Sequence, residues 1–399
     1  MVIKVLAIGD IGNIVRTLTK FTKKSKIHLI QYPKDGSGVF TYYDDVETFE
    51  NWKVSDNIKK INEIKDDYDI CLTIGSERLP YLADLNYIGY YLGRDIDVPR
   101  WIKNSAEEWN TEPLFRFNFF ERRFYWNAFK NAVAHVAGMW QFEYLQRYTD
   151  EGINNAGIPI DTTEFNPEVK PIDTKKEKFV FFSPNRFEKF RGTDLLWEAI
   201  KLCKSDFEIL MVDYPRSNTQ EDRDFREKLV ETKPSQVKLI QPIKRSEIAR
   251  YYRYADAVIA NLFIGTFEMV GLESVMCGTP VIQYTDRKKK IIVNGKAIES
   301  PFAPFSKDPK DIAEMIDKVV ESKEFRDELF KKEYKFVDQV ANPEKCAEWW
   351  DNLFEELVDK HKTINKNSSK IRVKLRMYGF LIANRLYLDK IRKISSLFK

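Results

Sequence analysis

Residues 255–284, ADAVIANLFIGTFEMVGLESVMCGTPVIQY, are the stretch that decides the fold of this 399-residue chain. Ala257 to Ala260 is a short apolar run typical of a buried strand, and a glycine-containing turn follows it. Glu268 to Met276 has helical spacing, and Gly278–Pro280 then ends that helix. Val281-Ile282 opens the next strand, so the stretch predicts a βαβ unit. A helix that starts at the carboxyl end of a strand is a usual place for anionic ligands.

The segment 272–282, LESVMCGTPVI, resembles the E-A-M-A-x-G-x-P-V-I block of retaining glycosyltransferases of group 1 (family four). The resemblance implies the two-domain GT-B fold. In that family the block closes a Glu-x7-Glu motif, whose second glutamate binds the ribose of the nucleotide while amides at the helix start hold the diphosphate. Glu273 matches the second glutamate, and the amides near Met269 and Val270 are the implied diphosphate ligands.

The chain departs from this pattern at two positions. The first glutamate of the motif contacts the transferred sugar in the family, and its place is taken by Gly265. A glycine of the family motif is replaced by Glu268, which brings an unfavourable charge to a phosphate site unless its side chain turns away.

A second block, NRFEKFRGTDLLWEAI at 185–200, resembles the family pattern G-R-L-x-x-x-K-G-x-x-x-L-I-x-A. Arg186 and Arg191 match its two cations, which hold the donor diphosphate in the family. Two strong donors after a strand and beside a helix start suit a diphosphate clamp, and solvated loop charges are the alternative. Ile243 lies after a later strand, where the family contacts the nucleobase through backbone groups. The blocks keep the family's order from about residue 155 to 285.

The first half of the chain predicts a second parallel α/β sheet, because strands recur every 20 to 40 residues with helices between them. Ile3 to Ile8 is the first strand, and the loop after it contains Gly12. This loop either faces the cleft between domains or is only a tight turn. The strand Tyr87 to Leu92 leads to Asp95, which matches the aspartate of a family H-G-x-D loop. Asp95 is a candidate acceptor or sugar contact, with an Asx-type turn as the alternative.

Composition excludes several classes of protein. The four cysteines form no CxxC pair and have no nearby histidine, so zinc and disulfide frameworks are not expected, and no metal motif is visible. The net charge is +4, but residues 370–399 carry nine Lys or Arg against Asp389 alone, so the rest of the chain is net negative. A basic body that would indicate nucleic-acid binding is therefore absent. No apolar run reaches the length of a membrane-spanning helix.

Two stretches indicate a surface that binds something beyond a nucleotide. Residues 101–129 hold ten aromatic side chains mixed with arginines, more than one buried helix face needs. Residues 370–399 form a basic amphipathic pattern that suits an anionic membrane surface. The alternatives are a packed core face for the first stretch and a solvated helix docked on the protein for the second.

The sequence thus predicts an α/β protein of the GT-B class, with two Rossmann-like domains facing an inter-domain cleft. The expected parts are an acceptor-side domain at 1–168, a nucleotide-sugar domain at 169–345, and at 346–399 helices that cross back plus the basic tail. The expected activity is retaining transfer of a sugar from a nucleotide-diphosphate sugar to a glycan or lipid-linked acceptor, without a cofactor. The expected location is the cytoplasm or, peripherally, the inner face of the cell membrane. A non-catalytic nucleotide-sugar- or lipid-binding protein and a nucleotide-sugar epimerase are the alternatives.

Overall fold

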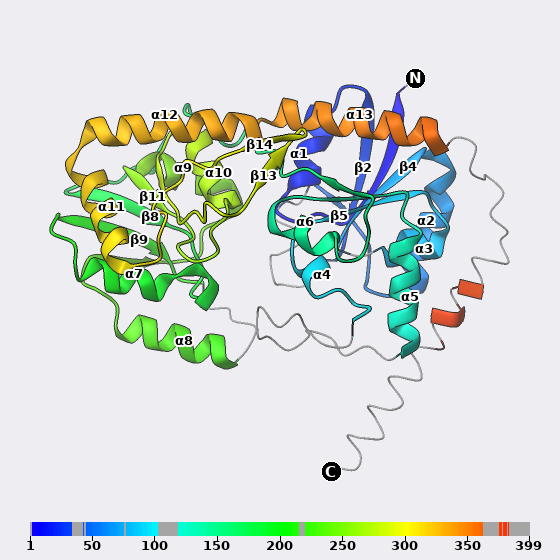
Figure 1. The fold of residues 1–399 in the computed structure, drawn as a ribbon, viewed down its shortest axis with the longest axis horizontal. Helices are drawn as coiled ribbons and strands as arrows, with labels where there is room; N and C mark the ends of the chain where they lie inside the picture. Colours follow the sequence, from blue (N-terminus) through cyan, green and yellow to red (C-terminus); the bar gives the residue numbers. More distant parts are fainter. Residues whose placement is uncertain are drawn as a thin grey trace, which may run out of the picture. The chain divides into compact units, whose positions relative to one another are not determined.

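The computed structural model divides into two compact units. Unit 1 consists of residues 1–156 and 347–399, and unit 2 of residues 157–346 (Figure 1). The structure describes residues 2–33, 43, 45–75, 77–102, 119–214, 220–361, 375–376, 378–380 and 382. Each unit contains its own parallel β-sheet, whose strands are joined through helices because parallel neighbours need crossover connections.

Unit 1 is built on a seven-stranded sheet of order β3-β2-β1-β4-β5-β6-β7, in which every neighbouring pair is parallel. Its strands are β1 (Ile3–Ile8), β2 (Ser25–Gln31), β3 (Glu47–Thr48), β4 (Ile70–Ile74), β5 (Tyr87–Tyr91), β6 (Ala134–Ala137) and β7 (Gly152–Asn154). The strand order reverses between β1 and β4. Ligands of open α/β sheets bind beyond the carboxyl ends of strands at such a switch point.

Helices connect the strands of unit 1, and its core is completed from the far end of the chain. The helices are α1 (Ile14–Phe21), α2 (Val54–Ile64), α3 (Arg78–Ala83), α4 (Arg94–Asp97), α5 (Phe119–Lys130) and α6 (Met139–Leu145). Helix α13 (Pro343–His361) contributes Trp350, whose fully buried ring packs 4.9 Å from that of Tyr90. The carboxylate of Asp351 accepts hydrogen bonds from the backbone amides of Lys23 and Lys24 at 2.8 and 2.9 Å.

The described part of the C-terminal tail also contacts unit 1. Arg376 pairs with Asp84 at 2.5 Å and donates to the carbonyl of Tyr81 at 3.1 Å. Phe380 is buried against Phe124 of α5, with ring centroids 4.8 Å apart. Most of the basic amphipathic stretch at 370–399 and most of the aromatic stretch, residues 103–118, lie outside the described residues.

Unit 2 is built on a five-stranded parallel sheet of order β10-β9-β8-β11-β12. Its strands are β8 (Phe179–Ser183), β9 (Phe207–Val212), β10 (Val237–Ile240), β11 (Ala257–Ile259) and β12 (Val281–Ile282). The strand order reverses between β8 and β11, so the loops after these two strands meet at the switch point of this sheet. A separate antiparallel hairpin pairs β13 (Ile291–Val293) with β14 (Lys296–Ile298).

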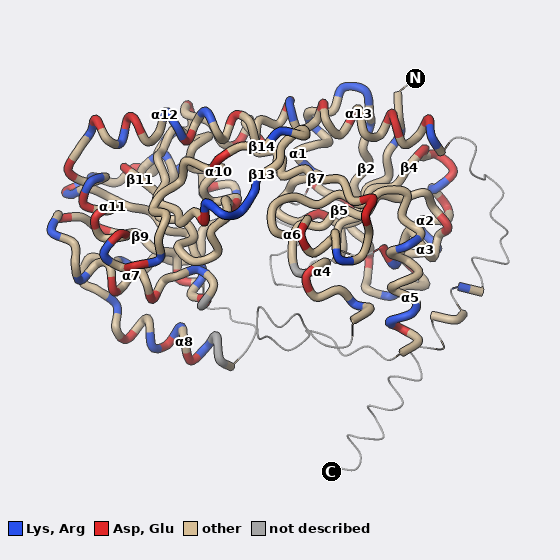
Figure 2. Tube along the Cα trace, in the orientation of Figure 1, with Lys and Arg blue, Asp and Glu red and all other residues tan. Residues whose placement is uncertain are grey.

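The helices of unit 2 are α7 (Thr193–Ile200), α8 (Gln220–Glu231), α9 (Ile248–Tyr254), α10 (Met269–Met276), α11 (Pro309–Glu321) and α12 (Lys323–Val340), with short turns η3 (Lys189–Arg191) and η4 (Arg245–Glu247). One buried cluster packs α7 and α11 against the sheet through Trp197, Phe181 and Ile316. Cations and carboxylates alternate along α12 in Figure 2, as expected for a solvated helix face.

The predicted α/β class with two parallel sheets is confirmed. The βαβ unit expected at 255–284 is present as β11, α10 and β12, with α10 beginning one residue later than predicted. The first strand, Ile3–Ile8, has the predicted bounds. Strand β5 ends at Tyr91, one residue before its predicted end.

Candidate functional site

The loop after β8 carries both predicted cations and holds them near a carboxylate. Arg186 lies three residues beyond β8, and Arg191 ends the short turn η3 just before α7. Glu188 lies between them, with its carboxylate 3.7 Å from Arg186 Nη1 and 3.6 Å from Arg191 Nε. Gly192 then starts α7 with φ +74°, and a Cβ there would lie 3.0 Å from the backbone of Leu262. Glycine therefore permits the close approach of the β8 and β11 loops.

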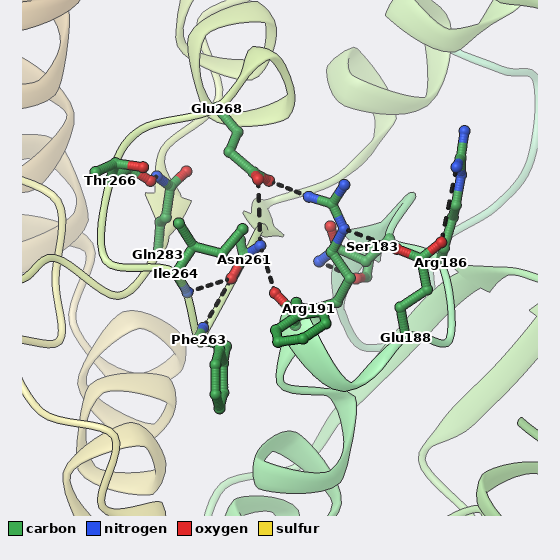
Figure 3. Close-up of polar contacts among 12 residues, drawn as sticks. Ser183, Arg186, Glu188, Arg191, Asn261, Phe263, Ile264, Thr266, Glu268 and Gln283 are labelled. Atoms are coloured by element: carbon green, nitrogen blue, oxygen red, sulfur yellow. Dashed lines mark hydrogen bonds and ion pairs between the residues drawn. The ribbon is translucent and has the colours of Figure 1, made fainter. Parts of the chain in front are cut away.

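Asn261 organises the loop after β11 and joins it to the loop after β8. Its Oδ1 accepts from the amides of Phe263 and Ile264 at 2.8 and 2.9 Å. Its Nδ2 donates to the carbonyl of Phe190 at 3.0 Å and to Glu268 at 3.3 Å (Figure 3). The side-chain oxygen accepts hydrogen bonds and the side-chain nitrogen donates them, so this fully buried residue fixes the loops after β8 and β11 against each other.

Arg191 and Glu268 form the central ion pair of this site. The Nη1 of Arg191 lies 2.5 Å from the Oε2 of Glu268, and the two side chains are 28% and 21% exposed. Figure 3 shows the two groups pointing toward each other across the loops. The neighbouring Glu268 carboxylate raises the pKa of Arg191 above its ordinary value. Burial lowers this pKa, but its effect is smaller than that of the carboxylate. Glu268 therefore does not turn away from the predicted phosphate cation but binds it.

The start of α10 leaves backbone amides open beside this pair. Glu268 is the N-cap residue of α10, but its side chain makes no capping hydrogen bond. The amides of Met269, Val270 and Gly271 have no acceptor within the helix, as is true of the first turn of any α-helix. Arg191 and these amides lie at the carboxyl edge of the sheet, where an anion that displaces Glu268 from Arg191 would meet both kinds of donor.

Glu273 lies on the second turn of α10 and is almost fully buried, at 1% exposure. Arg245, from the turn after β10, donates to both carboxylate oxygens: Nη1 to Oε2 at 2.9 Å, and Nη2 to Oε1 through a shorter contact. The hydroxyl of Tyr252 on α9 donates to Oε2 at 3.0 Å, and the guanidinium carbon of Arg245 lies 4.7 Å from the ring centroid of Phe165. Burial, followed by the Glu273 charge, raises the pKa of Tyr252 well above its ordinary value, so its hydroxyl stays a donor.

The position of the missing first glutamate is filled by other residues. Gly265 has φ +79°, and a Cβ there would lie 2.8 Å from side-chain atoms of both Tyr284 and Asp286. The loop is also fixed by a hydrogen bond from the amide of Asp286 to the carbonyl of Gly265 at 3.0 Å. This backbone has no room for a glutamate side chain at 265, so Gly265 contributes at most its own peptide groups.

Further cations follow β12, and sequence reasoning missed them. Arg287–Lys290 is an unbroken basic run, seen in Figure 2 as a blue segment leading into β13. Lys289 donates to the carbonyl of Ile264 at 2.7 Å, so the run is attached to the β11 loop. In the sequence, four consecutive cations after an apolar strand would have been enough to mark this loop as a candidate anion-binding segment. Ile243 is half-buried in the loop between β10 and η4, two residues before Arg245.

Unit 1 holds the two remaining predicted residues. Gly12 lies in the turn between β1 and α1, where the buried carboxylate of Asp10 accepts from the amides of Val15 and Arg16 at 3.0 and 2.9 Å. Burial raises the pKa of Asp10 to about 7. Asp95 lies in α4 and accepts from the amide of Gly93 at 3.1 Å, and burial raises its pKa to about 7. This local bond fits the turn interpretation of Asp95.

A buried chain of polar side chains in unit 1, not predicted from the sequence, joins Glu77 after β4 to Tyr91 at the end of β5 and His135 within β6. The hydroxyl of Tyr91 lies 2.6 Å from Glu77 Oε1 and 2.9 Å from His135 Nδ1. Burial lowers the pKa of His135 to about 4, so this histidine is neutral at physiological pH. In the described part of the chain, no group of three or more acidic, His or Cys side chains could hold a metal ion. None of the helices that the structure describes combines the length and apolarity needed to span a bilayer.

Comparisons with known proteins identify the segment that carries this site. Residues 164–336 match the family model described as glycosyl transferases group 1. A 132-residue stretch is 25% identical to a D-inositol 3-phosphate glycosyltransferase of Arthrobacter sp. (strain FB24) and covers 31% of each protein. A 115-residue stretch is 30% identical to a D-inositol 3-phosphate glycosyltransferase 1 of Catenulispora acidiphila, covering 27% of this chain and 28% of that protein. The chain thus spans less than a third of the length of these curated relatives.

Solved structures match over most of the chain. Sucrose-phosphate synthase from Thermosynechococcus elongatus has a TM-score of 0.62 and 16% identity, covering 90% of this chain and 100% of that one. The Anabaena protein HepE, in complex with UDP and glucose, has a TM-score of 0.61 and 12% identity, covering 89% and 100%. At sequence identities of 12 to 16%, the structural similarity establishes the fold of this chain. The predicted GT-B class with two Rossmann-like domains is therefore confirmed.

Proposed function

We propose that this chain, which carries a domain of the glycosyl transferases group 1 family in residues 164–336, transfers a sugar from a nucleoside-diphosphate sugar to an acceptor hydroxyl with retention at the anomeric carbon. One observation carries the proposal. At the switch point of the unit 2 sheet, the guanidinium of Arg191 lies beside the open first turn of α10, inside the segment that matches the family. This is the chemistry that binds a diphosphate.

The site would act mainly on the leaving group. During transfer, the bond between the anomeric carbon and the diphosphate oxygen breaks, and its electron pair remains on the diphosphate. Arg186, Arg191 and the amides of Met269 and Val270 would stabilise this developing charge from fixed positions. Such preorganised donors often contribute more to enzymatic rate enhancement than any other single effect. The acceptor oxygen forms the new bond to the anomeric carbon, and its proton passes to the departing diphosphate oxygen.

Glu273 remains our candidate for the ribose, although it is buried. A carboxylate offers about four acceptor positions, and Arg245 and Tyr252 use three of them. The remaining position is on Oε1, and it is the one that a ribose hydroxyl would occupy. Ile243 lies near Arg245 in sequence, and its peptide group would contact the base. The similar Anabaena protein HepE has been solved in complex with UDP and with UDP-glucose, which makes uridine nucleotides the first probes.

We further propose that the acceptor is lipid-linked or a glycan, and that unit 1 contacts the anionic inner face of the cell membrane from the cytoplasm. Phe119 and Phe120 at the start of α5 are 60% and 62% exposed. Leu375, Tyr378 and Ile382 of the tail are similarly exposed, and the tail is strongly basic. Exposed aromatics combined with cations suit the interfacial region of an anionic bilayer.

Vesicle sedimentation tests this membrane contact. Wild-type protein should sediment with vesicles containing anionic phosphatidylglycerol and should stay in solution with purely zwitterionic vesicles. Replacing Phe119 and Phe120 with serine should reduce sedimentation, while Leu202→Ser, at a 48% exposed position of unit 2, serves as the control. Equal binding by both variants would exclude α5 from the contact.

A non-catalytic nucleotide-sugar-binding protein is the second candidate. The packing around Gly265 excludes a glutamate at the position where the family contacts the transferred sugar, and Glu268 already pairs with Arg191. Both features weaken the case for efficient turnover. Release of free nucleoside diphosphate from a sugar donor, measured with purified protein, would exclude the non-catalytic role.

Ligand-induced thermal stabilisation tests the proposed function directly. UDP, GDP, ADP and dTDP and their glucose esters would be compared at increasing concentration. A ligand at 100 times its dissociation constant should add about 2.7 kcal/mol of stability. Arg191→Ala should weaken binding about tenfold or more, because a charge-assisted phosphate contact is lost. Arg250→Ala on α9, which removes an exposed ion pair with Glu247 of η4, is the control and should bind normally. Unchanged affinity in Arg191→Ala would remove this residue from the site.

A further inference from the structure

The phosphate-binding cation of unit 2 already has an anionic partner from its own chain. The Oε2 of Glu268 lies 2.5 Å from Arg191 Nη1, so the carboxylate and the guanidinium are in direct contact. The Oε1 of the same group accepts from Asn261 at 3.3 Å. Both oxygens of Glu268 are thus directed into the site, and neither caps the helix that Glu268 begins.

The charge of Arg186 is also compensated, because Glu188 lies between Arg186 and Arg191. The Glu188 carboxylate is 3.6 Å from Arg191 and 3.7 Å from Arg186. Two guanidinium groups therefore face two carboxylates in the loops around the switch point (Figure 3). A diphosphate entering this site would have to take Arg191 from Glu268, and Glu268 would remain close to the bound phosphates.

We propose that Glu268 sets the preference of this site between the sugar donor and the nucleoside diphosphate product, by competing with phosphate for Arg191 and repelling the more highly charged ligand. The inference rests on the proposed function. A nucleoside diphosphate carries about one more negative charge at neutral pH than its sugar ester, because its terminal phosphate is free. A nearby carboxylate therefore penalises the product more than the donor, and it favours release of the product after transfer.

Binding measurements with Glu268→Gln test this role. Glutamine keeps the size of the side chain and one acceptor oxygen, so it can accept from Arg191 or from Asn261 but not from both, and it removes the charge. Dissociation constants would be measured by calorimetry for UDP, GDP, ADP and dTDP and for the glucose ester of each. For the pair that binds, we expect the diphosphate to bind about tenfold tighter and the sugar ester about threefold tighter than in the wild type, the range that partly exposed charges produce.

Glu208→Gln is the matched control. Glu208 has a side-chain exposure of 22%, close to the 21% of Glu268, and it pairs with Lys238. It lies near the amino end of β9, at the edge of the sheet opposite the site. Glu208→Gln should leave the ratio of the two dissociation constants unchanged. Glu268→Ala is a second variant in case the glutamine forms a new contact, and it should change the ratio in the same direction.

The outcomes separate this inference from the function on which it rests. If wild-type protein binds a diphosphate and its sugar ester but Glu268→Gln and Glu268→Ala bind both no tighter, the inference is overturned and Glu268 instead orients Arg191. An equal gain for both ligands also overturns it, since charge discrimination is then absent. If no nucleotide binds to the folded wild-type protein or to any variant, the proposed function fails and the inference with it.

Discussion

Removing the guanidinium of Arg245 should strongly destabilise unit 2. Glu273 is 1% exposed, and Arg245 supplies hydrogen bonds to both of its oxygens. Removing one partner of a buried ion pair typically costs about 3 to 5 kcal/mol. The hydrogen bond from Tyr252 to Glu273 remains, so we expect Arg245→Met to cost about 3 kcal/mol, at the low end of that range. For a unit of this size the loss corresponds to a fall in Tm of about 6 to 12 °C.

Fluorine NMR of protein labelled with 5-fluorotryptophan can assign this loss to the correct unit. The chain has eight tryptophans, and Trp197 alone belongs to residues 157–346. Trp197 is buried in the core of unit 2, so its signal follows the unfolding of that unit, while the six other tryptophans that the structure describes belong to unit 1. In Arg245→Met the Trp197 transition should shift to lower urea concentration, and the remaining transitions should stay in place.

A double-mutant cycle decides whether the loss comes from the ion pair. The neutral variant Glu273→Gln would be combined with Arg245→Met, because replacing both charges removes the uncompensated buried carboxylate. We expect the double variant to be more stable than Arg245→Met, with a coupling energy of about 2 kcal/mol. A Trp197 transition in Arg245→Met within about 0.5 kcal/mol of wild type would refute the reasoning, since a fully buried charge cannot lose its partner without cost.

Three further predictions concern stability and can use the same labelled protein. Gly192→Ala should cost unit 2 about 2 kcal/mol, because its φ of +74° and the backbone of Leu262 at 3.0 Å both oppose a Cβ; a change below about 0.5 kcal/mol would contradict this. Burial raises the pKa of Glu333 well above 4.5, so the folded state holds a proton that the unfolded state releases, and stability should fall as pH rises above about 4.5. Glu333→Gln should remove that slope, and a stability difference from wild type that stays constant from pH 5 to 8 would argue against a buried neutral acid. Asp351→Ala should shift the unit 1 transition by about 2 kcal/mol through loss of two amide hydrogen bonds, while the Trp197 signal stays unchanged.

The sequence predicted the elements of the site better than its contacts. Apolar runs and glycine signals located β11, α10 and β12, because those patterns depend on residues close together in the chain. The same spacing placed Arg191 in a loop after a strand, where the structure has it. It did not indicate that Glu268 faces Arg191, since that contact joins residues 77 positions apart. Local spacing carries no information on which of two loops a charged side chain will face.

The buried partner of Glu273 was missed for a related reason. Arg245 follows a strand as one of several cations in a polar stretch, and nothing local separates it from Lys244. Only the packing of α9 and η4 against α10 brings its guanidinium to Glu273. The packing around Gly265 is equally non-local, because it involves Tyr284 from beyond β12.

The division of the chain into units has a consequence for protein synthesis. Unit 2 is one continuous segment, residues 157–346, whereas unit 1 takes Trp350 and Asp351 from beyond that segment. During translation, residues 1–156 therefore leave the ribosome first but lack the ring that packs on Tyr90 and the carboxylate that binds the amides of Lys23 and Lys24. Unit 2 can complete its core before unit 1 does, although it is made later. Nascent chains stalled before residue 347 should expose the apolar surface of unit 1 to chaperones, and chains released after α13 should not.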